Sequence, residues 1–364
     1  MNAWKKGEAV LKSKAIVTLT AVVCCGGAIV AQETGKLPVV KIIATGGTIA
    51  GEAATSAQAE YKSGQVGVEA LIKAVPTLSK IARVSGEQIA NVGSQDMSDE
   101  IWLKLAKRIN QLAASPDVNG IAITHGTDTM EETAYFLHLA VKTKKPVVLT
   151  GSMRPSTALS ADGPLNIYNA VAVAADPQAV GRGVLVSIND QIHSAHDITK
   201  THTTATDTFM SPYRGVIGAT AYGLSHYYRS PYRKHTVDTP FNVDSATGLP
   251  RVDILYIFED MPGDLVDASV KAGAKGIVAA GVGNGNMPKA VMDALARAAK
   301  SGVVVVRASR VPLGFVGRNV EVDDDKLNFV AAEELNPPKA RILLRLGLMQ
   351  TTDPKHIQRM FNEY

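Results

Sequence analysis

The sequence predicts an α/β protein with a larger N-terminal domain, built on a mostly parallel sheet flanked by helices, and a smaller C-terminal α/β domain. Short apolar runs alternate along the chain with segments whose apolar residues recur at helical spacing. The runs are bounded by Gly, Thr or Asp, as is typical of strands buried on both faces of a parallel sheet. This alternation favours right-handed βαβ units, and a length of 364 residues suits two domains.

The N-terminal domain is predicted to cover residues 37–228. Ser98 is expected to cap a helix that runs to about Ala114, because Asp99 and Glu100 lie at the positive end of that helix. The predicted strands are Val39–Ala44, Gly120–Thr124, Pro146–Thr150 and Gly183–Ile188, and two further helices are Met130–Ala140 and Pro164–Ala175.

A polar passage with several prolines, residues 229–250, is predicted to link the two domains. The alternation of strands and helices resumes after it and continues through residues 251–364, the predicted C-terminal domain. The predicted strands there are Ile254–Phe258, Gly276–Ala280 and Val303–Arg307, and the helices are Pro288–Ser301, Ala340–Gln350 and Asp353–Phe361.

Residues 1–31 have the pattern of a secretory signal peptide. A lysine-bearing segment precedes an uncharged, mostly apolar run, Ala15–Ala31, which is shorter than the ~20 residues that span a bilayer. Cleavage is expected after Ala31, which predicts an exported, periplasmic protein without a membrane contact; an uncleaved membrane anchor is the alternative. Both cysteines, Cys24 and Cys25, lie in this segment, so the exported protein would have no disulfide.

The charge balance excludes several classes of partner. The formal net charge is +4, and the predicted signal peptide, with four lysines against one glutamate, carries +3 of it and leaves +1 for the rest. With 5% aromatic residues and no run of Lys or Arg, the chain has no electrostatic footprint for nucleic acid or an anionic membrane. Neither partner is expected.

Three loops that follow predicted strands combine glycines with hydroxyl side chains: Thr45–Gly51, Thr124–Thr129 and Thr150–Pro155. In an open α/β sheet, ligands bind beyond the carboxyl ends of the strands, where these loops lie. Glycine leaves backbone N–H groups open to a ligand, and threonine presents a hydroxyl at the same place. The loops therefore indicate a nucleophile beside an oxyanion site, although tight turns alone would explain any one of them.

Metal and nucleotide sites are not predicted. The Gly-rich loops fit neither the dinucleotide-binding nor the phosphate-binding pattern. His193 and His196 lie near Asp197, but their spacing matches no strong metal-ligand pattern, so no metal or other cofactor is expected. Lys200, close by, is either a surface charge or, if buried, a proton acceptor.

Five segments, taken in order, resemble one family. They are Ala44–Gly51, Gly93–Met97, Ile123–Thr133, Met153–Ser156 and Gly281–Asn286. Together they resemble the bacterial type II, periplasmic L-asparaginases of the asparaginase and glutaminase-asparaginase family. The resemblance runs from about Leu37 to Tyr364.

The resemblance implies a threonine amidohydrolase that converts L-asparagine and water to L-aspartate and ammonia, without a cofactor and with lower activity on L-glutamine. It implies that Thr48 is the nucleophile and forms a β-aspartyl enzyme intermediate. Tyr61 would lie beside Thr48, and Glu321 would partner the tyrosine. The second catalytic triad that it implies consists of Thr127, Asp128 and Lys200.

The resemblance also implies how substrate is bound and how the chains assemble. A homotetramer is expected, in which Asn286 and Glu321 reach the site of a neighbouring subunit. Asn286, where glutaminase-leaning relatives tend to have Ser, favours asparagine as the preferred substrate. The implied substrate-binding residues are Ser94, Gln95, Thr127, Asp128 and Asn286.

A different class of protein is the main alternative. Two α/β domains joined by a linker also suit an exported amino-acid-binding protein without catalysis, in which Ser94 and Asp128 would hold the ends of the ligand. That alternative gives no reason for two Gly-Thr turns, a tyrosine loop and Lys200. A serine or cysteine hydrolase is not predicted, because the chain has no G-x-S-x-G elbow and no cysteine after the signal.

Overall fold

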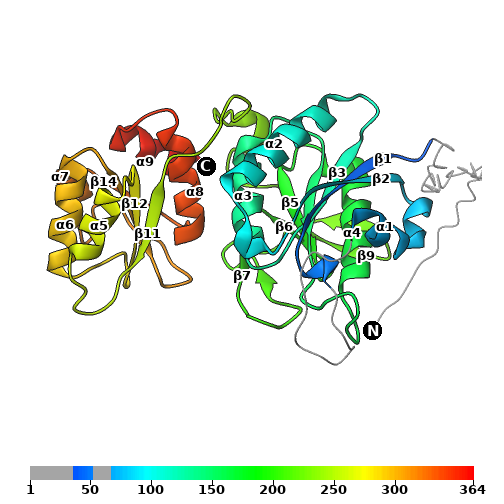
Figure 1. The fold of residues 1–364 in the computed structure, drawn as a ribbon, viewed down its shortest axis with the longest axis horizontal. Helices are drawn as coiled ribbons and strands as arrows, with labels where there is room; N and C mark the ends of the chain where they lie inside the picture. Colours follow the sequence, from blue (N-terminus) through cyan, green and yellow to red (C-terminus); the bar gives the residue numbers. More distant parts are fainter. Residues whose placement is uncertain (1–35, 52–66) are drawn as a thin grey trace, which may run out of the picture. The chain divides into compact units, whose positions relative to one another are not determined.

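The computed structural model describes residues 36–51 and 67–364 (Figure 1). Residues Leu37–Tyr364 form one compact unit. The predicted signal peptide, residues 1–31, and Tyr61 both lie outside the described residues. Within the described ranges, no helix is long and apolar enough to cross a membrane.

The first sheet has eight strands in the order β10-β9-β6-β5-β4-β3-β1-β2. The five strands from β5 to β2 in this order are parallel to one another, whereas β6, β9 and β10 pair antiparallel at the other edge. Its strands are β1 (Val39–Gly46), β2 (Arg83–Val92), β3 (Gly120–Thr124), β4 (Val147–Thr150), β5 (Val184–Ile188), β6 (Gln191–Ser194), β9 (Gly218–Ala221) and β10 (Leu224–Tyr227).

Helices cover both faces of this sheet, because successive strand residues point to opposite sides. Ile121 and Ile123 pack in the core with α2 and α3, whereas Ala122, between them, packs in the core with α1 and α4. Ser98 caps α2 and accepts a hydrogen bond from the backbone N–H of Ile101 at 3.3 Å. The four helices are α1 (Val68–Lys73), α2 (Asp99–Ala114), α3 (Met130–Ala140) and α4 (Gly163–Ala175).

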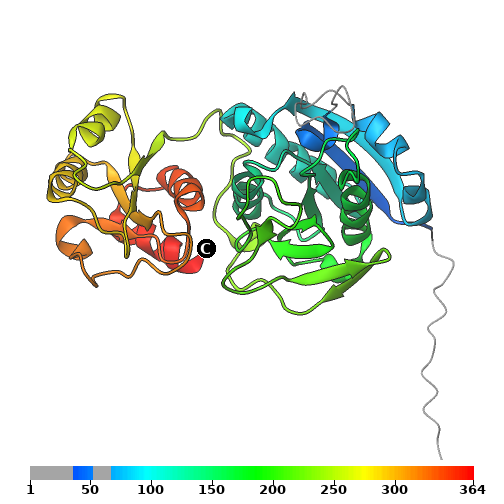
Figure 2. The ribbon, with the colours of Figure 1, turned by 90° about the horizontal axis from the view of Figure 1, so that it is seen from below.

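The second sheet has four parallel strands in the order β11-β12-β13-β14. The helices α5 and α6 lie on one face and α8 on the other (Figure 2). The strands are β11 (Val252–Tyr256), β12 (Gly276–Gly281), β13 (Val304–Ser309) and β14 (Phe329–Ala331), and the helices are α5 (Asp264–Lys271), α6 (Lys289–Lys300), α7 (Asp324–Leu327), α8 (Pro337–Leu348) and α9 (Pro354–Glu363).

The side chains of α8 also join a core that includes α2 and α3. At the end of the chain, the Tyr135 hydroxyl of α3 donates to the carbonyl oxygen of Tyr364 at 2.7 Å. A short two-stranded sheet, β7 (Thr199–Lys200) with β8 (Phe209–Met210), lies outside both large sheets. The first turn of α8 and this small sheet are both important for the site described below.

The predicted fold class is confirmed, and most predicted elements end within two residues of the observed ones. The helix predicted to begin at Ala340 begins instead at Pro337, because Asn336 caps it and accepts from the backbone N–H of Lys339 at 3.1 Å. The strand predicted to end at Phe258 ends at Tyr256. The domain boundaries at residues 229–250 stay a prediction.

Candidate active site

Two glycine-containing turns press against each other at the carboxyl ends of β1 and β3. Gly47, just before Thr48, has a φ of +84°, and a Cβ atom at Gly47 would lie 2.4 Å from the Cα atom of Gly126. Its N–H donates to the carbonyl oxygen of Val92, at the end of β2, at 2.9 Å. Only glycine therefore allows the turn before Thr48 to lie against the turn before Thr127.

Ser94 ties the end of β2 to the same place. A Cβ atom at Gly126 would lie 2.7 Å from the Oγ atom of Ser94. That oxygen accepts from the backbone N–H of Asp128 at 3.1 Å and of Thr129 at 3.4 Å. The structure therefore gives the buried Ser94 side chain a supporting role beneath the Thr127 loop; its predicted contact with substrate stays a prediction.

Lys200, Thr127 and Asp128 come together as the resemblance implies. The Nζ atom of Lys200 donates to the Oγ1 atom of Thr127 at 3.0 Å and to the Oδ1 atom of Asp128 at 2.6 Å. Thr127 is buried and the Asp128 side chain is 65% exposed, so the group opens to solvent on the aspartate side. An amine that contacts both a hydroxyl and a carboxylate can exchange a proton with the one while the other stabilises its charge.

A recess of about 370 Å³ adjoins this group. Asp128 and Lys200 line this recess together with Glu131, which lies in the first turn of α3. The histidine that precedes the Thr127 loop, His125, is fully buried, and burial lowers its pKa to about 4, so its ring is neutral at pH 7. The charge at the site therefore comes from the lysine and the acids.

The chain segments after β1 and β2 carry three other predicted site residues, Thr48, Tyr61 and Gln95. Thr48 is buried at 7% exposure and begins a short 3₁₀ helix, Thr48–Ala50. Gln95 is exposed, and its Nε2 atom donates to Asp96 at 3.2 Å. Tyr61 lies outside the described residues.

Asn286 and Glu321 lie at the second sheet and pair with each other. The Nδ2 atom of Asn286 donates to the Oε2 atom of Glu321. Among the described residues, neither side chain hydrogen-bonds to Thr127, Asp128 or Lys200. The structure of one chain therefore divides the predicted site residues into two groups.

A buried ion pair supports the loops of Asn286 and Glu321. Arg307 of β13 is fully buried and binds both carboxylate oxygens of Asp324 at 2.6 and 2.7 Å. It also donates to the carbonyl oxygens of Asn284 and Gly317, each at 3.0 Å. One guanidinium thus fixes the loop before Asn286 and the turn before Glu321.

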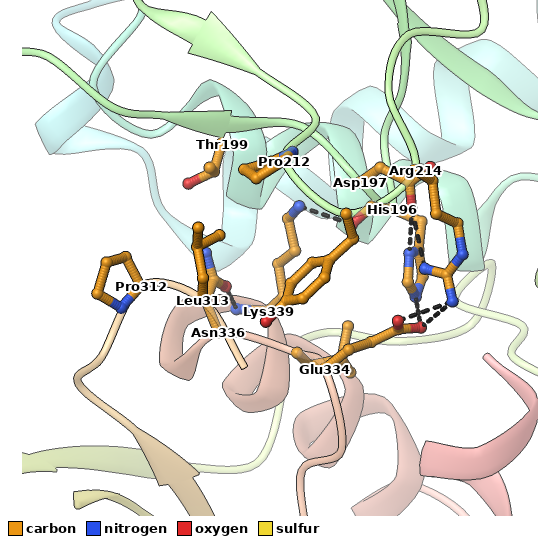
Figure 3. Close-up of a pocket in the computed structure, with 12 residues that line it drawn as sticks. His196, Asp197, Thr199, Pro212, Arg214, Pro312, Leu313, Glu334, Asn336 and Lys339 are labelled. Carbon is orange, nitrogen blue, oxygen red and sulfur yellow. Dashed lines mark hydrogen bonds and ion pairs between the residues drawn. The ribbon is translucent and has the colours of Figure 1, made fainter. Parts of the chain in front are cut away.

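The histidine-rich loop after β6 forms an internal ionic network (Figure 3). The Nδ1 atom of His196 lies 2.8 Å from the Oδ1 atom of Asp197, and Arg214 contacts both Asp197 and Glu334. Burial raises the pKa of Asp197, but His196 and Arg229 outweigh it and hold that pKa well below its usual range. Within the part of the chain that the structure describes, no group of three or more His, Cys, Asp or Glu side chains could hold a metal ion.

Three polar residues near Lys200 were missing from the predicted site: Glu131, Asn336 and Lys339. Glu131 begins a helix, where an acid is common for reasons of helix stability alone. Asn336 followed by Pro337 is a helix-start signal that could have been recognised. Asn336 and Lys339 are more than a hundred positions away from Lys200 in the sequence. Nothing in the local sequence indicates that these two residues, or Glu131, lie near it.

The fold and the site together define a class: an α/β enzyme in which an amine contacts both a threonine hydroxyl and a carboxylate beyond a parallel strand. Comparison with known proteins gives the family. The model of the N-terminal asparaginase domain matches residues 39–233, and that of the glutaminase/asparaginase C-terminal domain matches residues 251–361. The chain belongs to the asparaginase family.

Several relatives cover nearly the whole chain. A probable periplasmic L-asparaginase of Haemophilus influenzae is 55% identical over 91% of this chain and 95% of its own. L-asparaginase 2 of Escherichia coli is 55% identical over 90% and 94%, and a glutaminase-asparaginase of Pseudomonas fluorescens is 49% identical over 90% and 91%. The crystal structure of a probable cytoplasmic L-asparaginase from Campylobacter jejuni matches with a TM-score of 0.87 and 49% identity, over 90% of this chain and all of that one.

These comparisons correct the predicted location. The sequence predicted a periplasmic protein, but the Campylobacter jejuni structure, which matches along its full length, is described as cytoplasmic. A periplasmic relative matches at similar identity, so similarity to the family assigns no compartment. The periplasmic prediction, which rested on the pattern of residues 1–31, is therefore wrong; signal cleavage after Ala31 stays a prediction about residues outside the described ranges.

Proposed function

We infer that this chain is an L-asparagine amidohydrolase, which converts L-asparagine and water to L-aspartate and ammonia. Membership of the asparaginase family supports this function, and relatives named glutaminase-asparaginase support a secondary activity on L-glutamine. The observation that carries the inference is the contact of the Lys200 amine with Thr127 and Asp128 at 3.0 and 2.6 Å. A protein that only bound an amino acid would not need an amine on a buried threonine hydroxyl.

The proposed reaction has two halves. In the first, the Oγ1 atom of Thr48 attacks the side-chain amide carbon of asparagine, while Tyr61 or Lys200 takes the hydroxyl proton. Backbone N–H groups at the Gly47 and Gly126 turns would stabilise the oxyanion, because both turns lie beside the hydroxyls. Collapse breaks the C–N bond, the leaving nitrogen takes a proton, ammonia departs, and a β-aspartyl ester remains on Thr48.

In the second half, water attacks the ester carbon and gives up a proton to the Thr127–Lys200 pair. The C–O bond to Thr48 then breaks, the Thr48 oxygen takes a proton back from this pair, and L-aspartate leaves. The Asp128 carboxylate, which is exposed toward the recess, suits the α-ammonium group of the substrate. Lys200 thus has two roles: its amine holds Asp128 in place, and it is near enough to Thr127 to exchange a proton.

We propose further that the enzyme is a homotetramer in which Asn286 and Glu321 complete the site of a neighbouring subunit. Two observations support this role: the pair is partly exposed, and among the described residues neither side chain hydrogen-bonds to Thr127, Asp128 or Lys200 of its own chain.

Ammonia release from purified protein, with L-asparagine and L-glutamine in parallel, tests the proposed function. Wild-type protein should release ammonia faster from asparagine. Thr48→Ala should lower kcat by about a thousandfold or more and still bind L-aspartate, because it removes the nucleophile and little of the binding surface. Thr48→Ser keeps a hydroxyl and should retain far more activity than Thr48→Ala.

Two outcomes would contradict the proposal. Near-normal turnover by Thr48→Ala would rule out Thr48 as the nucleophile. Saturable binding of asparagine by the wild-type protein, with no ammonia released from either amide, would instead indicate an amino-acid-binding protein.

A further inference from the structure

The N-terminal end of α8 contacts the segment that carries Lys200. Lys339, in the first turn of this helix, is only 3% exposed (Figure 3). Its ammonium donates to the carbonyl oxygen of His196 at 2.7 Å and to that of Ile198 at 2.5 Å. A buried ammonium that binds the carbonyl groups of two residues, one on each side of Asp197, fixes the backbone immediately before β7, the strand of Lys200.

Glu131 forms a second link between α8 and Lys200. Its Oε2 atom accepts from the backbone N–H of Lys200 at 3.0 Å, and its Oε1 atom accepts from the Nδ2 atom of Asn336, also at 3.0 Å. The Oδ1 atom of Asn336 accepts from the backbone N–H of Lys339, which leaves Nδ2 as the atom that must face Glu131. Each donor in this chain of hydrogen bonds therefore meets one acceptor.

Charged side chains surround the two links between α8 and the Lys200 segment and stabilise them. Burial lowers the pKa of Lys339, and the nearby carboxylates of Glu131, Asp197 and Glu334 oppose that effect. Asp197 is itself bound by His196 and by arginines, so the loop before β7 is fixed on both sides. The pocket that Lys339 lines measures only about 30 Å³, and the lysine itself is buried, so its side chain is closely surrounded.

We propose that Glu131, Asn336 and Lys339 are positioning residues that hold Lys200 at catalytic distance from Thr127. None of the three contacts the Thr127 hydroxyl; they act through the backbone of residues 196–200. The proposal rests on the proposed function, in which the Lys200 amine exchanges a proton with Thr127. A displacement of about 1 Å at such a group costs up to about a hundredfold in rate.

An exchange of hydrogen-bonding groups between Glu131 and Asn336 tests the proposal. In Glu131→Gln, the new amide donor faces the donor of Asn336; in Asn336→Asp, two carboxylates face each other. Each single variant should lose about 10- to 100-fold in kcat with little change in KM. The double variant restores a donor opposite an acceptor, keeps a good helix cap at residue 336, and should recover at least about tenfold over the weaker single variant.

The pH dependence separates positioning from simple electrostatics. Glu131→Gln removes a negative charge near Lys200 and Asn336→Asp adds one, so an electrostatic effect would shift the pH profile of kcat in opposite directions in the two variants. Positioning instead lowers kcat in both across the whole profile. Wild-type kcat in both single variants, opposite pH shifts without a loss of kcat, or no recovery in the double variant would each overturn the proposal.

Two further variants keep the test decisive. Asn336→Ser retains the helix cap but loses the donor to Glu131; it replaces any single variant that fails to fold, and wild-type kcat in it would overturn the proposal. Lys200→Met separates this proposal from the proposed function. If Lys200→Met is inactive while the Glu131 and Asn336 variants are fully active, only the positioning role fails; if Lys200→Met is active, the catalytic role of Lys200 fails with it.

Discussion

The two large sheets carry their polar loops in different ways, although both present glycine-rich loops at the carboxyl ends of parallel strands. At the first sheet, three loops interlock through Gly47, Gly126 and Ser94, and Lys200 meets Thr127 within the same chain. At the second sheet, the Asn286 side chain donates to Glu321, in loops supported by the buried pair Arg307–Asp324, and within the described ranges neither side chain hydrogen-bonds to Thr127, Asp128 or Lys200.

The difference teaches what each region can do alone. The first set of loops brings an amine, a hydroxyl and a carboxylate within hydrogen-bond distance, which is enough for proton transfer. The second set offers an amide and a carboxylate on a rigid support, with no nucleophile in contact. A supported pair that hydrogen-bonds to none of Thr127, Asp128 and Lys200 in the described part of its own chain suits the proposed role at the site of another copy.

The largest expected effect comes from separating the two regions onto different chains. Thr127→Ala and Glu321→Ala should each lower kcat by about a hundredfold or more, since each removes one half of a composite site. When the two inactive proteins are unfolded, mixed in equal amounts and refolded together, about a quarter of wild-type activity should return, because hybrid pairs then hold one intact site. Ammonia release from the mixture and from each refolded variant alone is the measurement.

The same mixture can break the comparison. In the matched control, the Thr127→Ala protein and the Lys200→Met protein are refolded together. Both changes affect the group that Thr127, Asp128 and Lys200 form within one chain, so no hybrid pair restores a complete site. Recovery in this control, or none in the Thr127→Ala with Glu321→Ala mixture, would show that the two regions do not combine across subunits.

A smaller effect is expected from the support beneath Asn286 and Glu321. Arg307→Met leaves Asp324 buried without its partner and should lower the free energy of unfolding by about 3–5 kcal/mol. Arg297→Met breaks a pair with Asp267 that is about 60% exposed on both sides, and should cost less than about 1 kcal/mol. Urea unfolding followed by circular dichroism measures both; equal losses would contradict the proposed support.

The smallest effect concerns acid stability at the first sheet. Burial lowers the pKa of His193 to about 4, below its ordinary value of 6.5. The unfolded chain therefore binds a proton as pH falls below 6.5 while the folded chain does not, and stability is lost between pH 6.5 and 4, by about 2 kcal/mol at pH 5 for one such histidine. Above pH 6.5 this contribution is constant.

Replacement by asparagine isolates this contribution. His193→Asn keeps a polar atom near Ser211, which lies 2.9 Å from the Nδ1 atom of the histidine, and should make the urea midpoint less dependent on pH between 7.5 and 5. His356→Asn, at an exposed position, should leave that dependence unchanged. The same pH slope in His193→Asn and in the wild-type protein would refute the prediction.

The parts of the fold that the sequence predicts best are those whose signals are local. Ser98 caps α2, and the strands β3, β4 and β5 are mostly apolar and fully buried, so both kinds of element were expected at nearly their observed bounds. The long strand β2 was not predicted, because it lies at the sheet edge and mixes polar with apolar residues. The antiparallel strands β6, β9 and β10 were missed for a similar reason: they are short and carry several polar side chains.

The site shows the same division. The topology rule alone brought the Thr48 and Thr127 loops to one edge of the sheet. From the residues alone, Lys200 was a surface charge or a buried proton acceptor; only the family resemblance grouped it with Thr127, since it follows an irregular loop whose course no local pattern predicts. Asn336 meets Glu131 across 205 positions of sequence, and only the packing of α8 on α3 creates that contact.

The link from Lys339 to the His196 carbonyl has a consequence for synthesis, because the two residues are 143 positions apart. A ribosome adds about 5–20 residues each second, so the segment of Lys200 emerges roughly 7–30 s before the helix that holds it. During that interval, the strands of the first sheet and Lys200 have been synthesised, but α8, which holds the Lys200 segment, has not. Under the proposed positioning role, Lys200 is therefore held at catalytic distance only after α8 has been made, and a chain truncated before α8 should lose that support.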